Sequence, residues 1–483
     1  MIPARAKDEL EALAAIGEVF QRDGKRLYLV GGRVRDLLLD RQDPSNDVDL
    51  TTDALPERVK ELVRGMASAV WATGERFGTI GCEIEGCTYE ITTHRAETYS
   101  PDSRKPQVAF SSDIEVDLSR RDFTVNAMAI EITGDHPTLI DPFGGLSDLA
   151  AGVLRTPIAP EESFSDDPLR MMRAARFISS YSLEAVPELT EAVNAMAERL
   201  SIVSSERIRD ELCKLVVVAD PSAGLYFLHD TGLAAHFFPE LPAMRLEQDP
   251  IHRHKDVLTH TIAVVAQAPA ELLVRLAALF HDIAKPATRA IGPNGVSFHH
   301  HEVVGARMTR ERMKALKFSN EMVSQISQLV YLHLRFHTYD MGWSDSAVRR
   351  FVRDADLLLP ELLALTRADC TTRNQRKADA LNRRIDDLEL RIAQLSEQEE
   401  LRSIRPELNG QEVMSHLGVA EGQVVGRALN YLLELRLERG PVSPEQAVTD
   451  LDVWWAQQPE NPAAVLASNL TEQGFEDKAQ TKE

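Results

Sequence analysis

The alternation of apolar and polar residues over residues 1–155 predicts a small mixed α/β layer. A helix is expected over roughly residues 6–22, followed by a short apolar strand, Leu27–Val30, that ends at two glycines. The period-two pattern then predicts further strands, each bounded by turn residues, at residues 47–51, 79–85, 88–93 and 126–131. We expect this layer to end near Arg155.

From Asp167 onward the spacing of apolar residues becomes that of helices. Pro168 suits a first helical turn, and the helical register continues to about residue 243. A second helical block is expected over residues 252–369. It is interrupted once, where Asn294-Gly295 predicts a hairpin turn.

Beyond this block, one helix carries an apolar seam. Its residues are spaced 4-3-4-3: Leu381, Ile385, Leu388, Ile392 and Leu395. The seam is too short for a long coiled coil, and we expect it to pack onto its own chain. The last twenty or so residues are polar, and we expect a disordered tail.

A chain of 483 residues is too long for one hydrophobic core. The patterns divide it into four regions: an α/β domain over residues 1–155, a helical region over 156–245, a second helical domain over 246–372, and a helical C-terminal region with its tail over 373–483. The expected fold class is α+β, with a small α/β domain followed by mostly helical domains.

The composition, 43% hydrophobic and 27% charged, is that of an ordinary globular protein. No apolar run has the length of a membrane span, and the N-terminus lacks the apolar stretch of a signal peptide. The four cysteines, at positions 82, 87, 213 and 370, form no CxxC pair. Cys82 and Cys87 could lie across a strand turn, but we interpret these two as buried thiols. These features predict a cytoplasmic protein without a membrane partner.

The net charge of −21 results from 54 basic and 75 acidic residues. This balance argues against non-specific binding to a polyanion, and we expect no DNA partner. If the protein binds nucleic acid, local basic surfaces must supply the attraction.

The turn after the first strand has the sequence Gly31-Gly32-Arg33-Val34-Arg35-Asp36. Two glycines between a strand and a helix allow close approach of the backbone, so that N–H groups and the helix N-terminus can contact phosphates. Arg35 adds a planar fork suited to a phosphate or a ribose hydroxyl. A glycine pair alone is common and mostly structural. This turn therefore indicates phosphate binding only together with neighbouring motifs.

The next strand begins with Asp47-Val48-Asp49. Residues two apart in a strand point to the same face, so both carboxylates converge on one point. A divalent cation would relieve their repulsion, and two Mg²⁺ ions would activate a hydroxyl and neutralise a leaving pyrophosphate. The alternative is a solvated acidic edge before a turn. Glu90, on a neighbouring predicted strand, is a candidate third carboxylate.

Four further motifs follow in order: Arg120 to Ala129 (RRDFTVNAMA), Asp141 to Gly145 (DPFGG), Asp166 to Phe177 (DDPLRMMRAARF) and Ser205 to Arg209 (SERIR). Together with the turn and the Asp pair, they resemble the class II tRNA nucleotidyltransferases, or CCA-adding enzymes, and the related bacterial poly(A) polymerases. The resemblance covers residues 25–215. It implies a polymerase-β-like nucleotidyltransferase head, a helical neck that selects the nucleotide and binds tRNA, and two Mg²⁺ ions.

The resemblance also implies roles for individual residues. Asp47 and Asp49 match the metal-binding pair and are the expected catalytic residues. The expected nucleotide contacts are Gly32, Arg35, Arg121, Asp167, Arg170, Arg173 and Arg176. Of these, Asp167 and Arg170 match the side chains that read the base edge of CTP or ATP in place of a nucleic-acid template. The structural alternative is a helix cap at Asp167 with Arg170 as its partner. Asp166 stands where the family usually has Glu, which puts a contact at that position in doubt.

The second helical domain contains His260, the adjacent pair His281-Asp282, and Asp369. Such a pair on an apolar helix offers a nitrogen and an oxygen ligand to one metal, and a distant His and Asp complete four ligands. The set resembles the HD phosphohydrolase superfamily and implies a divalent metal of unspecified identity. His301 and His333 would extend the site. An HD domain with a purely structural role is the alternative.

The leading hypothesis is a tRNA nucleotidyltransferase that adds CCA from CTP and ATP, with tRNA as its partner and HD phosphohydrolase activity as an accessory function. Within the family the alternatives are a poly(A) polymerase or an enzyme that adds only CC or A. From another class, the chain would be an HD phosphohydrolase with a nucleotide-binding module. A silent RNA-binding protein is disfavoured because both Asp47 and Asp49 are present.

Overall fold

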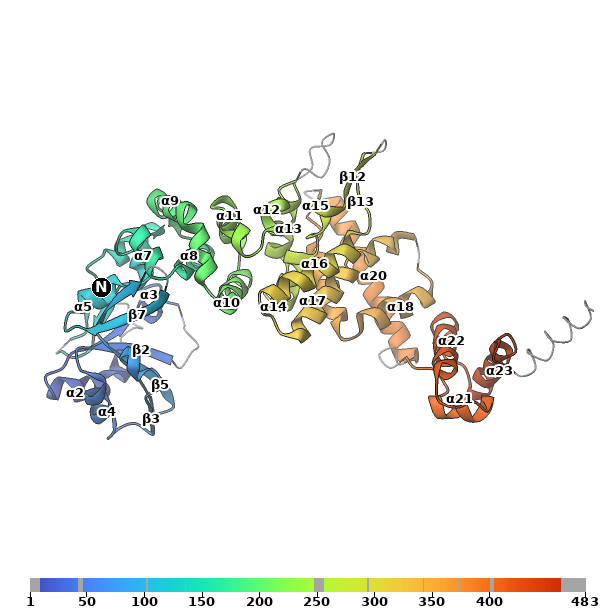
Figure 1. The fold of residues 1–483 in the computed structure, drawn as a ribbon, viewed down its shortest axis with the longest axis horizontal. Helices are drawn as coiled ribbons and strands as arrows, with labels where there is room; N and C mark the ends of the chain where they lie inside the picture. Colours follow the sequence, from blue (N-terminus) through green and yellow to red (C-terminus); the bar gives the residue numbers. More distant parts are fainter. Residues whose placement is uncertain are drawn as a thin grey trace, which may run out of the picture. The chain divides into compact units, whose positions relative to one another are not determined.

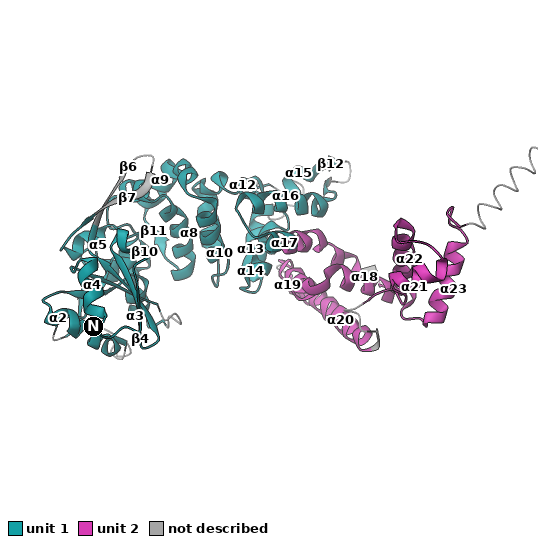
Figure 2. Cartoon of the chain, turned by 60° about the horizontal axis from the view of Figure 1, so that its bottom comes forward, with its two compact units in different colours: residues 1–324 teal, residues 325–483 magenta. Residues whose placement is uncertain are grey.

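The computed structural model describes residues 9–41, 47–100, 103–134, 136–246, 256–292, 295–341, 343–371, 374–399 and 404–461. The chain divides into two compact units, Met1–Ser324 and Gln325–Glu483, coloured separately in Figure 2. Among the described residues, none of the helices combines the length and the apolar character that crossing a membrane requires.

The first unit begins with a seven-stranded sheet in the order β3-β4-β5-β2-β1-β8-β9. Its strands are β1 (Leu27–Val30), β2 (Asp47–Thr52), β3 (Ala69–Trp71), β4 (Thr79–Ile84), β5 (Cys87–Thr93), β8 (Ala129–Glu131) and β9 (Thr138–Ile140). β2 pairs antiparallel with β1 and parallel with β5. A separate hairpin joins β6 (Arg95–Ser100) to β7 (Ser103–Phe110).

The sheet forms because its apolar residues are buried against helices. The associated helices are α2 (Ala14–Arg22), α3 (Gly32–Leu38), α4 (Pro56–Val63), α5 (Ile114–Ser119) and α6 (Gly145–Ala151), and Figure 1 shows α2 and α4 beside the blue strands. All four residues of β1 are buried, whereas β2 buries Val48 and Leu50 and exposes Asp47 and Asp49. The first part of one face of β2, at Asp47 and Asp49, is therefore open to solvent, whereas Thr51 on the same face is buried.

The observed strands differ from the predicted ones at residues 126–131. Residues Thr124–Asn126 form a 3₁₀ turn, and β8 begins only at Ala129. The Asn126 side chain binds Asp122 and Arg35 instead of extending a strand, which explains the shorter strand. The short strands β3 and β9 were not predicted. Three residues each are too few for a period-two signal.

The helical part of the first unit begins with α7 (Pro160–Asp166), α8 (Leu169–Tyr181), α9 (Pro187–Met196), α10 (Ser205–Val216), α11 (Ser222–Asp230) and α12 (Glu240–Ala243). β10 (Val153–Leu154) pairs with β11 (Glu184–Ala185) between them. α8 packs against both α10 and α11. Gly224 permits the close approach of α11, because a Cβ there would lie 2.3 Å from the Ala175 carbonyl oxygen.

A further group of helices follows in the same unit: α13 (Val257–Gln267), α14 (Leu272–Phe280), α15 (Lys285–Thr288) and α16 (His301–Ala315). Buried Arg275 on α14 donates to the carbonyl oxygens of Val216, at 3.0 Å, and Val218, at 3.3 Å, just where α10 ends. The guanidinium thus satisfies helix-end carbonyls and fixes α14 against α10. The predicted hairpin is present, because β12 (Arg289–Gly292) pairs with β13 (Gly295–Phe298); Asn294 itself lies outside the described residues.

α17 (Asn320–Leu332) runs across the division between the two units. The second unit then contains α18 (Asp345–Ala355), α19 (Leu359–Ala368), α20 (Gln375–Glu399), α21 (Gly410–Leu417), α22 (Gln423–Arg439) and α23 (Pro444–Trp455). The apolar seam of α20 packs on its own chain, as predicted: its residues Ile385 and Leu388 are fully buried, and α18 and α19 contact the helix. The predicted C-terminal tail lies outside the described residues.

Candidate active site

Three carboxylates gather on the open face of the sheet. Asp47 and Asp49 are exposed on β2, as their spacing predicted, and the parallel register places Glu90 of β5 directly opposite Asp49. Partial burial and the two neighbouring aspartates raise the pKa of Glu90 above its ordinary value. The three groups repel one another, which is the arrangement a divalent cation relieves.

The glycine turn between β1 and α3 borders these carboxylates. Gly31 has a φ of 78°, and a Cβ there would lie 3.1 Å from Arg121 Nη1 and 3.7 Å from Asp49 Oδ2. Only glycine suits both the left-handed backbone and this close approach. The turn therefore brings peptide N–H groups, a guanidinium and a carboxylate within a few ångströms of one another.

Arg121 reaches this position from the motif that follows α5. Burial lowers the pKa of its guanidinium, and its Nη2 lies 3.5 Å from Oδ2 of the fully buried Asp117. Within the part of the chain that the structure describes, Arg121 Nε has no hydrogen-bond partner. An incompletely bonded guanidinium beside a glycine turn is suited to an anionic ligand.

Arg35 has a different environment from the one predicted for a phosphate contact. Its side chain is only 5% exposed; it donates to Asn126 Oδ1 and pairs with Asp36 at 2.7 Å. The guanidinium also lies 4.0 Å from the centre of the Tyr181 ring on α8. Arg35 thus connects the glycine turn to the helical region, and its predicted triphosphate contact stays a prediction. The same holds for Gly32, where a Cβ would lie 3.3 Å from Arg35 Nη2.

Asp167 and Arg170 lie at the junction of α7 and α8, and each is held by other partners. Asp167 accepts the Leu169 N–H at 3.2 Å and pairs with Arg207 of α10 at 2.9 Å. Buried Arg170 donates to the hydroxyl of Ser163 at 2.7 Å and to the carbonyl oxygen of Arg120. Asp167 therefore caps the start of α8, as the structural alternative predicted. Arg170 is not its partner there, because the Arg170 side chain binds the Arg120 carbonyl oxygen of the head.

Arg173 and Arg176 continue along α8 and pair with buried carboxylates. Arg173 donates to Asp122 Oδ2 at 2.7 Å, and Arg176 donates to Glu211 Oε2 at 2.7 Å. Asp122 is 8% exposed and Glu211 4%. Burial alone would raise the pKa of Asp122, but Arg173 and Asn126 outweigh it and lower the pKa to about 2. The two arginines thus join α8 to the head and to α10.

Sequence reasoning did not assign roles to Asp122, Arg207 and Glu211. Arg207 and Glu211 are four residues apart on α10 and so share one helix face. Their charges are opposite to those of Asp167 and Arg176, so the complementary charges of the two motifs could have predicted these ion pairs. The pairing of Asp122 with Arg173 could not be predicted in this way, because the two residues are 51 positions apart in the sequence.

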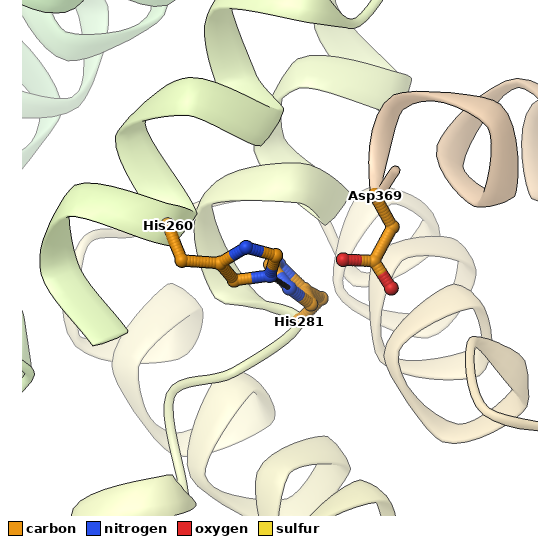
Figure 3. Close-up of side chains that lie close together, drawn as sticks. All are labelled: His260, His281 and Asp369. Atoms are coloured by element: carbon orange, nitrogen blue, oxygen red, sulfur yellow. Dashed lines mark hydrogen bonds between the residues drawn. The ribbon is translucent and has the colours of Figure 1, made fainter. Parts of the chain in front are cut away.

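The HD residues of the first unit converge on Asp282. His260 lies on α13, and His281 and Asp282 directly follow α14. Asp282 Oδ2 is 3.1 Å from His281 Nε2 and 3.5 Å from His260 Nε2, and the two Nε2 atoms are 3.4 Å apart. Figure 3 shows the two imidazole rings next to each other. His301 Nε2, at the start of α16, lies 3.5 Å from Oδ1 of the same carboxylate.

The second unit contains the remaining predicted HD residues. Asp369 follows the end of α19, and its Oδ2 is 3.7 Å from His337 Nε2. His333 is 3% exposed, and its Nδ1 is 2.6 Å from the Val330 carbonyl oxygen. The sequence analysis did not name His337.

An α/β head with clustered carboxylates beside a glycine turn, followed by arginine-rich helices, defines a metal-dependent nucleotidyltransferase. Comparison with sequence families agrees with this class. The poly A polymerase head domain matches residues 27–155, the probable RNA and SrmB-binding site of polymerase A matches residues 185–244, and the HD domain matches residues 257–395.

Individual relatives identify the family. The chain is 32% identical over 423 residues to the A-adding tRNA nucleotidyltransferase of Deinococcus radiodurans, covering 83% of this chain and 95% of that protein. It is 39% identical over 235 residues to the CCA-adding enzyme of Lactobacillus johnsonii, covering 48% of this chain and 56% of the relative. The chain belongs to the family of tRNA nucleotidyltransferases and poly(A) polymerases, as the motifs predicted.

Solved structures agree with the expected fold class. The crystal structure of the Bacillus stearothermophilus CCA-adding enzyme in complex with CTP aligns with a TM-score of 0.66 at 25% identity, covering 91% of this chain and 95% of that one. The Thermotoga maritima CCA-adding enzyme complexed with tRNA aligns with a TM-score of 0.58 at 19% identity, covering 92% and 94%, and shows the likeness of the fold alone.

The low pKa of Asp122 generates a prediction about stability. A carboxyl whose pKa falls from 3.8 to about 2 on folding stabilises the folded state by about 2 kcal/mol above pH 4. That contribution is lost as the pH falls through about 2. Asp122→Asn should therefore lower the denaturation midpoint of the protein at pH 7, and its deficit should shrink as the pH is lowered below 4.

Denaturant titrations at a series of pH values measure this effect. Asp210→Asn is the matched control, since Asp210 is 54% exposed and pairs only with its neighbour Arg209 among the contacts recorded for the described residues. It should change the midpoint little at any pH. An Asp122→Asn deficit that stays constant down to pH 2 would contradict the assignment.

Proposed function

We propose that this nucleotidyltransferase adds CCA to the 3′ end of tRNA from CTP and ATP, without a nucleic-acid template. The observation that carries the proposal is the cluster of Asp47, Asp49 and Glu90 beside the turn at Gly31. Nucleotidyl transfer needs a carboxylate cluster for metal ions and a nearby anion-binding turn for the triphosphate. The head provides both within one open face of the sheet.

Asp47 and Asp49 are the proposed catalytic residues and would hold two Mg²⁺ ions. When bound, such ions activate the 3′-hydroxyl for attack on the α-phosphate and neutralise the leaving pyrophosphate. Glu90 fits as the third carboxylate, since its raised pKa marks a group that gains from a nearby cation. The carboxylates are exposed, which suits an exchange of metal and nucleotide with each addition.

The remaining head residues would bind and orient the triphosphate. The Gly31-Gly32 turn lies at the N-terminus of α3, where backbone N–H groups favour an anion. Arg121 would add a charged donor at this turn, because its guanidinium already lies beside Gly31. Arg35, Arg173 and Arg176 would act by positioning α8 as well as by contacting the nucleotide.

Asp167 and Arg170 would select the base. Reading a base edge requires donor and acceptor groups with fixed orientations, and partners of both side chains provide that fixation. Arg207 orients the Asp167 carboxylate, while Ser163 and the Arg120 carbonyl fix the plane of the Arg170 guanidinium. A cytosine edge and an adenine edge would each pair with a different part of this set.

A second candidate is an enzyme that adds only the terminal A. The relative that matches 83% of this chain is an A-adding enzyme, whereas the match to the CCA-adding enzyme of L. johnsonii spans only about half of either protein.

The addition assay separates the two candidates. A tRNA lacking its last three nucleotides, given CTP alone, should gain two residues, and with CTP and ATP it should gain three. Asp49→Asn should abolish addition in the same assay and leave tRNA binding intact, because only the metal ligand is lost. Asp53→Asn is a matched carboxylate control one residue beyond β2 and should retain activity. Addition of a single A, and only to a tRNA that already ends in CC, would establish the A-adding alternative.

The templating pair generates its own prediction. Asp167→Ala and Arg170→Ala each leave part of the base edge unpaired, which should cost about 1–3 kcal/mol of discrimination, or roughly ten- to a hundredfold in selectivity. Each variant is assayed with all four nucleoside triphosphates on tRNA lacking CCA. Relaxed incorporation of UTP or GTP supports the role. An equal loss of rate for every nucleotide, with the CTP and ATP preference unchanged, would make the pair structural.

We propose further that the HD residues hold a divalent metal and hydrolyse phosphate esters. His260, His281 and Asp282 of the first unit present ligand atoms 3.1–3.5 Å apart. Asp369, which the resemblance gives as the fourth ligand, belongs to the second unit. Neighbouring ligands of one ion have about this separation, because each lies about 2.0–2.2 Å from the metal. With four protein ligands or fewer, positions remain for water and a phosphate.

The hydrolase proposal predicts that the two activities separate. His281→Ala should remove metal-dependent phosphodiesterase or phosphatase activity, measured with Mg²⁺, Mn²⁺, Ni²⁺ and Co²⁺. Nucleotide addition should remain largely intact, because the carboxylates of the head are untouched. Absence of hydrolysis by the wild-type protein with all four metals would leave the HD domain a structural role.

A further inference from the structure

One row of residues crosses the sheet of the head from its edge strand to the carboxylates. The registers pair Trp71 of β3 with Gly81 of β4, and Gly81 with Glu90 of β5. Glu90 in turn pairs with Asp49 of β2. The strand neighbours of the last three belong to the apolar core on the other face: Ile80, Cys82, Tyr89, Ile91, Val48 and Leu50. Because successive side chains in a strand alternate between the faces, Trp71 lies on the same face as the carboxylates.

The indole of Trp71 covers the sheet at Gly81. A Cβ at position 81 would lie 2.0 Å from Trp71 Nε1 and 2.2 Å from Trp71 Cε2, so only a glycine leaves room for the ring. Gly81 is buried, whereas Trp71 is only partly buried. Among the described residues, none accepts a hydrogen bond from the indole N–H. The row thus leaves an aromatic surface beside the carboxylates for a ligand.

The glycine turn and Trp71 lie on opposite sides of the carboxylates. In the strand order β3-β4-β5-β2-β1, the carboxylates Glu90 and Asp49 occupy β5 and β2. Trp71 lies on β3, and Gly31 directly follows β1. In nucleotidyl transfer the attacking hydroxyl and the leaving pyrophosphate lie in line, on opposite sides of the phosphorus. With the triphosphate at Gly31, the 3′-hydroxyl of the RNA approaches from the side of Trp71.

The spacing along the row and the chemistry of the ring suit the last base of the RNA. Neighbouring strands lie about 4.8 Å apart, so the indole over Gly81 is about one strand from Glu90 and roughly 10 Å from Asp49. The base of a nucleotide likewise lies several ångströms from its own 3′-hydroxyl. The terminal base of the RNA also changes with successive additions. Stacking on an aromatic ring tolerates such changes, because every base has a π-face.

We propose that Trp71 stacks on the base of the 3′-terminal nucleotide of the RNA and thereby holds its 3′-hydroxyl at the carboxylates. The ligand is a nucleobase of any identity at the end of a single strand. The inference rests on the proposed function, since it places the acceptor of that reaction. Gly81 is a positioning residue, because the absence of a side chain lets the indole lie against the sheet.

An RNA without its terminal base tests the stacking. The wild type and Trp71→Leu, which stays apolar but lacks a π-face, are given ATP and one of two RNAs. The first is a tRNA ending in CC, and the second is the same tRNA with an abasic 3′-terminal nucleotide. Either change alone should lower kcat/KM for the RNA about ten- to a hundredfold, as expected for the loss of one base stack, with the KM for ATP unchanged. The two changes together should lower it no further.

Three other variants complete this experiment. Trp71→Phe keeps a π-face and should retain most of the activity, whereas Gly81→Ala should reproduce the loss because its Cβ displaces the indole. Val70→Ala is the matched control, since Val70 is 40% exposed beside Trp71 on the same strand, and it should behave as the wild type. If Trp71→Leu does not fold, Trp71→Met replaces it. Losses from Trp71→Leu and from the abasic nucleotide that multiply would overturn the stacking.

A binding measurement reads the same contact without chemistry. The tRNA carries the fluorescent base 2-aminopurine at its 3′ end, and no nucleotide is added. Binding should quench the fluorescence with the wild type and with Trp71→Phe, and at least fivefold less with Trp71→Leu. Equal quenching by Trp71→Leu would overturn the inference. A wild-type protein that adds no nucleotide would overturn the proposed function, while the quenching would still decide whether Trp71 stacks on the terminal base.

Discussion

Like charges held together on a sheet determine how the head of this protein is built. Asp47, Asp49 and Glu90 share one exposed face because β2 and β5 pair in parallel register. Their mutual repulsion costs free energy that the apolar residues on the opposite face must offset, and Val48 and Leu50 are correspondingly buried. Such a group of carboxylates on a sheet face is stable in the folded protein because of this burial, and a divalent cation would relieve the repulsion. The glycine turn and the Arg121 guanidinium lie next to Asp49.

Buried carboxylates also connect the head to the first helices, and here arginine side chains neutralise them. Asp122 and Glu211 are buried, and each is paired with an arginine of α8. A buried carboxylate without such a partner would be strongly destabilising, so each pair fixes the distance between two elements. Arg275 extends the connection by donating to carbonyl oxygens at the end of α10. Arg170 therefore lies on a helix, α8, whose position is determined by charge pairs on two sides.

The negative charge of Asp282 is compensated by histidine and lysine side chains. Asp282 is almost fully buried and is surrounded by three imidazoles and one lysine. Burial would raise its pKa, but His281 and Lys285 hold the pKa well below its ordinary value. The residues of the head share an open face that solvent can reach, whereas those around Asp282 lie within a helical core. The two clusters of charged residues thus differ in how far solvent reaches them.

The sequence by itself determined the family, the fold class and the identity of the carboxylate pair. These follow from local rules, since residues two apart in a strand share a face and the motifs occur in a fixed order. The sequence also placed the apolar seam of α20 correctly, because helical spacing is local. Tertiary structure alone decided which charges pair. Asp122 meets Arg173 across 51 residues, and Arg170 turns to the carbonyl of Arg120 instead of pairing with Asp167. Such partners depend on how elements distant in the chain pack, which no spacing along the sequence encodes.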